Sequence, residues 1–291
     1  MVIKFYGLRM PTKILSDALL LTDPDAYIDV VDAPDTIPIT FKFTFVNNEG
    51  RTLYVKAELV DAPEGYSMEP VEVGSVGNGK SVSFEVTVYR TKPESTDFAE
   101  LEESITLRIS AYTDSEYSAL YSFVDVSLNI HIINSAHPSW SVVKSYDFDD
   151  GELKDITHAI ERVGSEKTCE TSVKVSSYYY VTPPYSCRVG VDYAGICDRY
   201  IYAVIPVDLR AYTKAYLVAY ARIWSPYLYH MKVVVGDRIY IFNLPEQEVW
   251  YKIVVPLNTE IDAVKVGVYC GGWEGYLREG LYLDSIKIIA M

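Results

Sequence analysis

The stretch Thr36 to Val46, TIPITFKFTFV, alternates apolar and polar side chains along its whole length. Its apolar members are Ile37, Ile39, Phe41, Phe43 and Phe45, which fall on one face of an extended chain. A period of two residues is typical of a β-strand that is buried on one face only. We therefore expect a strand here, with its apolar face in a core.

Other stretches of the first half alternate in the same way, and turn residues such as Asn47-Asn48-Glu49-Gly50 separate them. These stretches are Thr52–Val60, Val82–Tyr89, Ile105–Tyr112 and Phe123–Ile133. Short strands at regular spacing with turn signals between them indicate a β-sandwich.

The second half reads as further strands with no long helix, although Glu152–Arg162 could form one or two helical turns. The expected strands are Ser172–Val181, Tyr185–Val191, Arg199–Pro206, Ala215–Trp224, His230–Val235, Arg238–Asn243, Trp250–Leu257, Ala263–Cys270 and Leu281–Ile289. So many strands suit a jelly roll. The periodicity breaks between His131 and Trp140. We predict an all-β chain of two β-sandwich domains, 1–137 and 141–291.

The order of pieces in residues 25–134 resembles a known module. FTFVNNEGRTLYVKAEL is followed by APEGYSMEP, VGNGKSVSFEVTV and SITLRISAY. This pattern resembles the immunoglobulin-like NEW3 and CARDB domains. The resemblance implies a spacer or docking unit.

Residues 145–291 carry an ordered set of motifs. They open on Phe148-Asp149-Asp150-Gly151, continue through Pro183-Pro184-Tyr185-Ser186 and Trp250 to Leu257, and close on Leu281 to Ile288. Together these resemble jelly-roll carbohydrate-binding modules and their galactose-binding-like relatives. Ser285 departs from the usual Leu-Asp-Asp-Ile ending.

The net charge of −14 and the pI near 4.7 argue against binding to nucleic acid or to anionic membrane surfaces. No apolar run is long enough to span a membrane, and the first 22 residues lack the pattern of a signal peptide. We expect an extracellular, cell-surface or virion protein. The low Met and Cys content with abundant Tyr would suit a thermophile.

The four cysteines contain no CxxC pair, which disfavours a zinc site. One or two disulfides are plausible, and Cys187 and Cys197 could face each other across neighbouring strands. The alternative is four buried thiols.

The resemblance of the second half implies a structural Ca²⁺, held by carboxylates and backbone carbonyls. Asp149 and Asp284 match the positions of the family best, and Asp147 and Asp150 are close by. The alternative is a solvated acidic turn with no metal.

Aromatic rings with polar tips suit a carbohydrate site. The best candidates are Trp224, Tyr227, Tyr229 and Trp273, and Tyr178 to Tyr180 form a second aromatic cluster. The alternative is that these rings are ordinary core and surface residues of strands.

Nothing in the sequence indicates catalysis. The four histidines are scattered, and the chain has no GxSxG, P-loop or GxGxxG motif. We expect a non-enzymatic recognition protein that binds a glycan or a protein surface. Two alternatives remain: a structural subunit of a virion, tail or filament, self-assembling through Val2–Leu21, and the accessory domains of a glycosidase.

Overall fold

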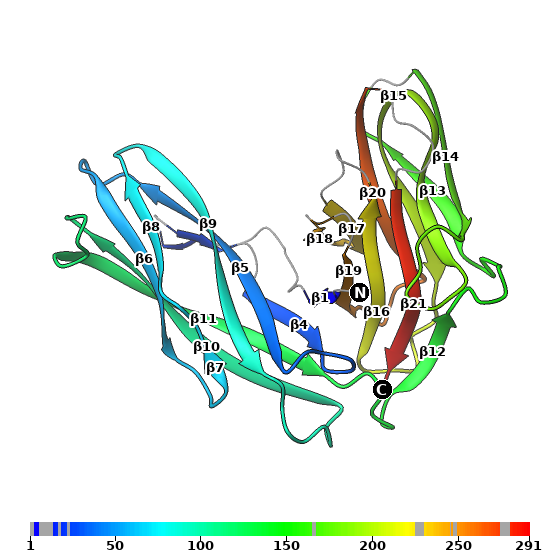
Figure 1. Ribbon diagram of the computed structural model, residues 1–291, viewed down its shortest axis with the longest axis horizontal. Helices are drawn as coiled ribbons and strands as arrows, with labels where there is room; N and C mark the ends of the chain where they lie inside the picture. The colour runs from blue at the N-terminus through cyan, green and yellow to red at the C-terminus, as the bar shows by residue number, and fades with distance from the viewer. Residues whose placement is uncertain are drawn as a thin grey trace. The chain divides into compact units, whose positions relative to one another are not determined.

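The computed structural model describes residues 3–5, 14–16, 19–21, 24–164, 167–224, 230–244, 246, 249–273 and 280–291. Within these ranges every regular element is a strand, so the all-β prediction is confirmed. In this part of the chain no helix has the length and apolarity needed to cross a membrane. The chain divides into one unit of residues 5–134 and another of residues 135–291 together with 1–4 (Figure 1).

The first unit contains two five-stranded sheets. One has the order β4-β11-β10-β6-β8, with β4 Asp25–Asp29, β11 Leu120–Ile133, β10 Glu100–Tyr112, β6 Leu53–Asp61 and β8 Val71–Val76. The other has the order β2-β3-β5-β9-β7, with β2 Ile14–Ser16, β3 Leu19–Leu21, β5 Thr36–Asn47, β9 Lys80–Thr91 and β7 Tyr66–Ser67.

The core of the first unit follows the alternation of its strands. On β5, the apolar face from Ile37 to Phe45 is buried, as the sequence predicts. The turn after β5 is held by Asn47, whose side-chain amide donates to the carbonyl oxygens of Arg51 at 2.8 Å and Val76 at 2.6 Å. The alternation of β5 is local, whereas its turn is fixed by one local contact and by one contact with β8.

The second unit is organised around one long strand, β15 (Ser186–Pro206). Its first part pairs with β14 (Lys167–Ser176) and β21 (Gly280–Ala290), and its second part pairs with β13 (Thr157–Arg162) and β20 (Ala263–Trp273). Because β15 changes partners along its length, it joins two groups of strands into one continuous 11-stranded sheet. The other strands are β1 (Ile3–Phe5), β12 (Ser141–Tyr146), β16 (Ala215–Trp224), β17 (His230–Val235), β18 (Arg238–Asn243) and β19 (Trp250–Leu257), in the order β1-β19-β16-β21-β15-β20-β17-β18, with β12 paired to β21.

Two expectations for the second half are wrong. The stretches Tyr185–Val191 and Arg199–Pro206 are parts of the single strand β15 and not separate strands. The segment 152–162, which could have formed one or two helical turns, contains the strand β13, because residues 157–162 find backbone partners along 199–204 of β15. An available sheet edge supplies more hydrogen bonds than one isolated helical turn does.

The cysteine pairing also differs from the expected one. Cys169 of β14 forms a disulfide with Cys197 of β15, with the two Cα atoms 5.4 Å apart. Cys187 is a buried free thiol, and burial raises its pKa to about 12. Cys187 and Cys197 cannot face each other across neighbouring strands, because both belong to β15.

Candidate functional site

The second unit carries a face of aromatic and charged side chains on the neighbouring strands β13, β15, β20 and β17. Along the second part of β15, Ile201, Ala203 and Ile205 are buried in the core. Successive side chains of a strand point to opposite faces of the sheet. Tyr200 and Tyr202 therefore project from the face opposite this core.

The register of the strands brings further groups to the same face. Tyr200 lies opposite Glu161 of β13 on one side and Tyr269 of β20 on the other. Tyr202 lies opposite Gly267 of β20. Directly opposed residues of an antiparallel pair share a face, so the two tyrosines of β15 are flanked by a carboxylate and a third tyrosine.

Strand β17 completes the arrangement. Lys232 lies opposite Gly267, and His230, two residues earlier, shares its face. We use the name tyrosine platform for four rings: Tyr200, Tyr202, Tyr269 and His230.

Tyr200 is the centre of the tyrosine platform. Its ring centroid lies 5.2 Å from that of Tyr269, 6.0 Å from that of Tyr202 and 6.5 Å from that of His230. The rings of His230 and Tyr269 are nearly parallel, at 12° and 6.2 Å. These are normal distances for interacting aromatic rings, and they make one continuous aromatic surface across three strands.

The side chains of the platform differ in their exposure to solvent. Tyr202 is only 2% exposed and Lys232 only 7%, whereas Tyr200, Tyr269 and His230 are half-buried. The Nζ atom of Lys232, which projects from the same face of the sheet, lies 4.1 Å from the centroid of Tyr200, a cation–π contact. Three rings are therefore partly accessible, and Lys232 restrains the central one.

Charged groups border the rings and fix their hydroxyls. The Tyr202 hydroxyl donates to Glu161 Oε2 at 2.5 Å, and Lys232 Nζ lies 3.1 Å from the same oxygen. The Tyr269 hydroxyl donates to Asp198 Oδ1 at 2.8 Å. Each carboxylate thus holds a platform tyrosine in place while lying at the rim of the aromatic surface.

Electrostatics keep the carboxylate of Glu161 charged and the His230 ring neutral near pH 7. The hydrogen bond from Tyr202 and the contacts with Lys232 hold the pKa of Glu161 below its ordinary value. Burial lowers the pKa of His230. The rim therefore offers charged hydrogen-bond acceptors beside a neutral imidazole that both donates and accepts.

Of the four aromatic residues predicted from sequence, Trp224 lies elsewhere. It ends β16 and packs, half-buried, on a cluster of Tyr220, Trp250 and Tyr282, with its ring 5.5 Å from that of Tyr179. Trp224 is therefore a packing residue of this aromatic cluster, and within the described residues its ring makes no contact with the four rings of the tyrosine platform.

The other predicted aromatic residues fall outside the described side chains. Tyr227 and Tyr229 lie outside the described residues, and only the backbone of Trp273 is described, at the end of β20 opposite Ile196. Tyr229 precedes His230 in sequence, and Trp273 shares β20 with Tyr269. The sequence reasoning named Trp273 on β20 and did not name Tyr200, Tyr202, Tyr269 or His230 as site residues, although Tyr200 and Tyr202 at alternate positions were a signal.

A pocket of about 420 Å³ lies on β14 and the first part of β15. Its polar lining includes Lys174, Arg188 and Asp192, and the exposed Tyr178 stands beside them. Asp192 pairs with the Lys174 ammonium and accepts from Arg188 Nη1 at 2.8 Å. Of the predicted Tyr178–Tyr180 cluster, Tyr178 lines this pocket and Tyr179 packs against Trp224.

The ion pairs of Asp192 predict a pH dependence of stability. Burial acts to raise its pKa, but the hydrogen bonds from Lys174 and Arg188 lower it to about 2. The pKa of an Asp in an unfolded chain is about 3.9. The stabilisation from the ionised Asp192 carboxylate is therefore complete well above that pH and is lost as the pH falls toward 2. We expect Asp192→Asn to lower stability at pH 7 and to flatten the loss between those pH values, measured by tryptophan fluorescence in urea. An unchanged slope would contradict this role.

The predicted calcium ligands differ in their surroundings. Asp149 is exposed in the turn after Phe148. Asp284 is fully buried and accepts hydrogen bonds from the backbone N–H groups of Val181 at 2.6 Å and Thr182 at 2.9 Å. It thereby ties the loop after β14 to β21, and calcium at Asp149 and Asp284 stays a prediction.

Comparison with known proteins gives no match to a protein-family model and no match among curated proteins. Solved structures with partial similarity include a structure of carbohydrate-binding modules from the β-sandwich superfamily, at 12% identity and a TM-score of 0.35, covering 86% of this chain and 91% of that chain. A tandem CBM22 domain of Paenibacillus barcinonensis Xyn10C aligns over 100% of both chains at 11% identity and a TM-score of 0.32. The mannan-recognising module TmCBM27 covers 52% of this chain and 98% of its own, at 10% identity and a TM-score of 0.32.

Proposed function

We propose that the second unit binds carbohydrate on the tyrosine platform. The observation that supports this most is the continuous surface of half-buried rings of Tyr200, Tyr269 and His230, bordered by charged acceptors. The apolar C–H face of a sugar ring packs on an aromatic ring, while its hydroxyls need polar groups at the edge. Aromatic rings that are already held in place cost little entropy on binding.

The charges at the rim favour a neutral glycan. Glu161 and Asp198 are acidic, Lys232 already pairs with Glu161, and Lys265 places a second positive charge near the same carboxylate. The whole chain carries a net charge of −14. A sulfated or uronic-acid polymer would meet repulsion, whereas carboxylates accept strong hydrogen bonds from uncharged hydroxyls.

The first unit completes the proposal as a non-catalytic, immunoglobulin-like spacer for display of the second unit at a cell or virion surface. Support comes from its two five-stranded sheets and its continuous apolar core. Sandwich domains occur in many cell-surface proteins, and the proposed spacer role rests on this likeness of architecture.

A glycan array of neutral and acidic polysaccharides, followed by calorimetry with the best ligand, tests this function. Tyr200→Ala should weaken binding roughly tenfold or more, because truncating a central aromatic residue commonly costs about 2 kcal/mol, and about 1.4 kcal/mol is already tenfold. Tyr178→Ala is the matched control, since it removes an exposed tyrosine from the β14–β15 pocket and should leave the affinity unchanged.

Two results would count against the proposal. One is the absence of binding to every glycan on the array. The other is a ligand whose affinity falls with Tyr178→Ala and stays the same with Tyr200→Ala, which would move the site to the pocket.

A further inference from the structure

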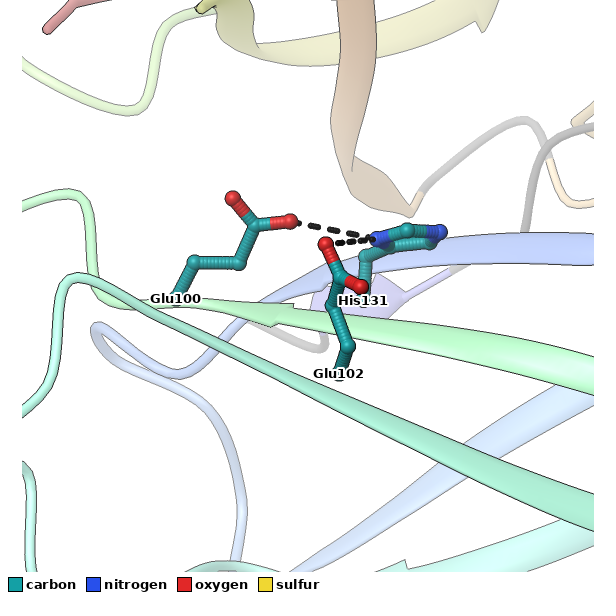
Figure 2. Close-up of side chains that lie close together, drawn as sticks. All are labelled: Glu100, Glu102 and His131. Atoms are coloured by element: carbon teal, nitrogen blue, oxygen red, sulfur yellow. Dashed lines mark hydrogen bonds and ion pairs between the residues drawn. The ribbon is translucent and has the colours of Figure 1, made fainter.

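The first unit brings a histidine and two glutamates together at one end of β10 and β11 (Figure 2). Glu100 and Glu102 are two residues apart on β10 and so share a face. His131 of β11 lies directly opposite Glu102. The register of one antiparallel pair therefore gathers an imidazole and two carboxylates on the same side of the sheet.

The ligand atoms are at the spacing of a metal site. His131 Nδ1 lies 3.1 Å from Glu100 Oε1 and 3.7 Å from Glu102 Oε1, and all three groups have a ligand atom within 4.8 Å of the others. In a tetrahedral zinc site with bonds of 2.0–2.2 Å, neighbouring ligands are about 3.3–3.6 Å apart. Small side-chain rotations would bring the three atoms to these distances.

The surroundings hold two of the ligands and leave one side open. The His131 ring stacks on Tyr27 of β4, with centroids 4.4 Å apart and planes at 8°. The side chains of His131 and Glu100 are 17% and 7% exposed, whereas that of Glu102 is 64% exposed. Figure 2 shows both carboxylates directed at the same ring nitrogen. A cation can enter from the side of Glu102 and keep one water there.

We propose that Glu100, Glu102 and His131 bind one divalent cation of the zinc class. An imidazole nitrogen with two carboxylates suits Zn²⁺ or Co²⁺, whereas Ca²⁺ takes an all-oxygen set of six to eight ligands. A metal ion binds an imidazole nitrogen only when that nitrogen carries no proton, so metal binding here should weaken as the pH falls. The cation would link β10 to β11 and stabilise the first unit.

Equilibrium dialysis of the full chain against Zn²⁺ at pH 7.5, read by elemental analysis, tests the site. We expect one ion per chain, and His131→Asn should lower the affinity roughly 100-fold, at least the loss seen when a ligand's supporting residue is removed. Glu102→Gln should weaken binding as well. The controls are His158→Asn and Glu72→Gln, which change the same residue types at exposed positions away from the cluster.

Co²⁺ provides a readout that is independent of affinity. Tetrahedral Co²⁺ gives visible absorption bands, which should appear with the wild type and the controls and be absent with His131→Asn. Circular dichroism confirms that each variant is folded. The absence of stoichiometric Zn²⁺ binding, or binding that survives His131→Asn unchanged, would overturn the proposal.

Discussion

Replacing Glu103 with alanine should lower the free energy of unfolding of the first unit by about 3–5 kcal/mol, the usual cost of removing one partner of a buried ion pair. The Glu103 carboxylate accepts from Arg90 Nε and Nη2 at 2.9 Å each, and from the Tyr66 hydroxyl at 2.5 Å. The Arg90 side chain is only 10% exposed, so alanine at 103 would leave its charge poorly solvated.

Further contacts hold the Arg90 guanidinium in place, and its Nη1 atom donates to the carbonyl oxygen of Thr91 at 2.6 Å. The guanidinium lies 5.1 Å from the centroid of the Tyr66 ring. Gly65 has a φ of +91°, and a Cβ there would lie 2.4 Å from Arg90 Nη1, so the chain keeps a glycine where the guanidinium passes. The pair therefore joins β7, β9 and β10 at a fixed point.

Urea unfolding followed by two probes measures this effect. All four tryptophans lie at positions 140–273, in the second unit, so tryptophan fluorescence reports that unit alone while far-ultraviolet circular dichroism reports both. Glu103→Ala should shift the circular-dichroism transition of the first unit and leave the fluorescence midpoint in place.

The matched control is Asp125→Ala, which removes an equally bidentate but exposed pair with Arg108. Exposed ion pairs contribute little to stability because solvent screens them, so Asp125→Ala should have a much smaller effect than Glu103→Ala. Equal losses for Glu103→Ala and Asp125→Ala would show that burial of the Arg90 pair contributes nothing.

Gly267→Ala should destabilise the second unit by about 3 kcal/mol and abolish binding to the tyrosine platform. A Cβ at this position would lie 2.1 Å from the backbone oxygen of Ile201 and 2.5 Å from Cδ1 of Tyr202. The backbone oxygen cannot rotate away, so β15 and β20 would have to separate. Gly267 is thus the residue that allows the Tyr202 ring to lie across β20.

Tryptophan fluorescence in urea gives the stability change, and calorimetry with the glycan gives the binding change. Gly77→Ala is the control, because an added Cβ there meets only the flexible side chain of Lys80 at 3.7 Å; it should shift the circular-dichroism transition by less than about 1 kcal/mol. If Gly267→Ala is as stable as the wild type and still binds, the close packing of Tyr202 on β20 has no role.

Much of the fold could be predicted from the period of two in the sequence. The apolar face of β5 from Ile37 to Phe45 is buried as expected, because alternation alone decides which side of a strand enters the core. The continuity of β15 was not predictable, since nothing local marks a strand that changes partners. The sheet edge that recruits 157–162 is likewise a tertiary feature.

The candidate sites show the same limit. Tyr200 and Tyr202 could be placed on one face of one strand, but the sequence does not give the register that sets Tyr269 opposite Tyr200. The same holds for Glu102 and His131, which are far apart in the chain and paired only by β10 and β11. Trp224 was a candidate because its aromatic ring lies at a strand end. The structure packs this ring on Tyr220, Trp250 and Tyr282, a tertiary contact that the sequence does not show.

The most direct test of a carbohydrate site on the tyrosine platform is a crystal structure of the protein with the oligosaccharide that binds best on the array. We predict a sugar ring in contact, within about 4 Å, with the rings of Tyr200 and Tyr269, and with hydroxyls bonded to Glu161 or Asp198. An oligosaccharide bound in the pocket of Lys174, Tyr178 and Arg188, or anywhere else with the platform empty, would contradict the account.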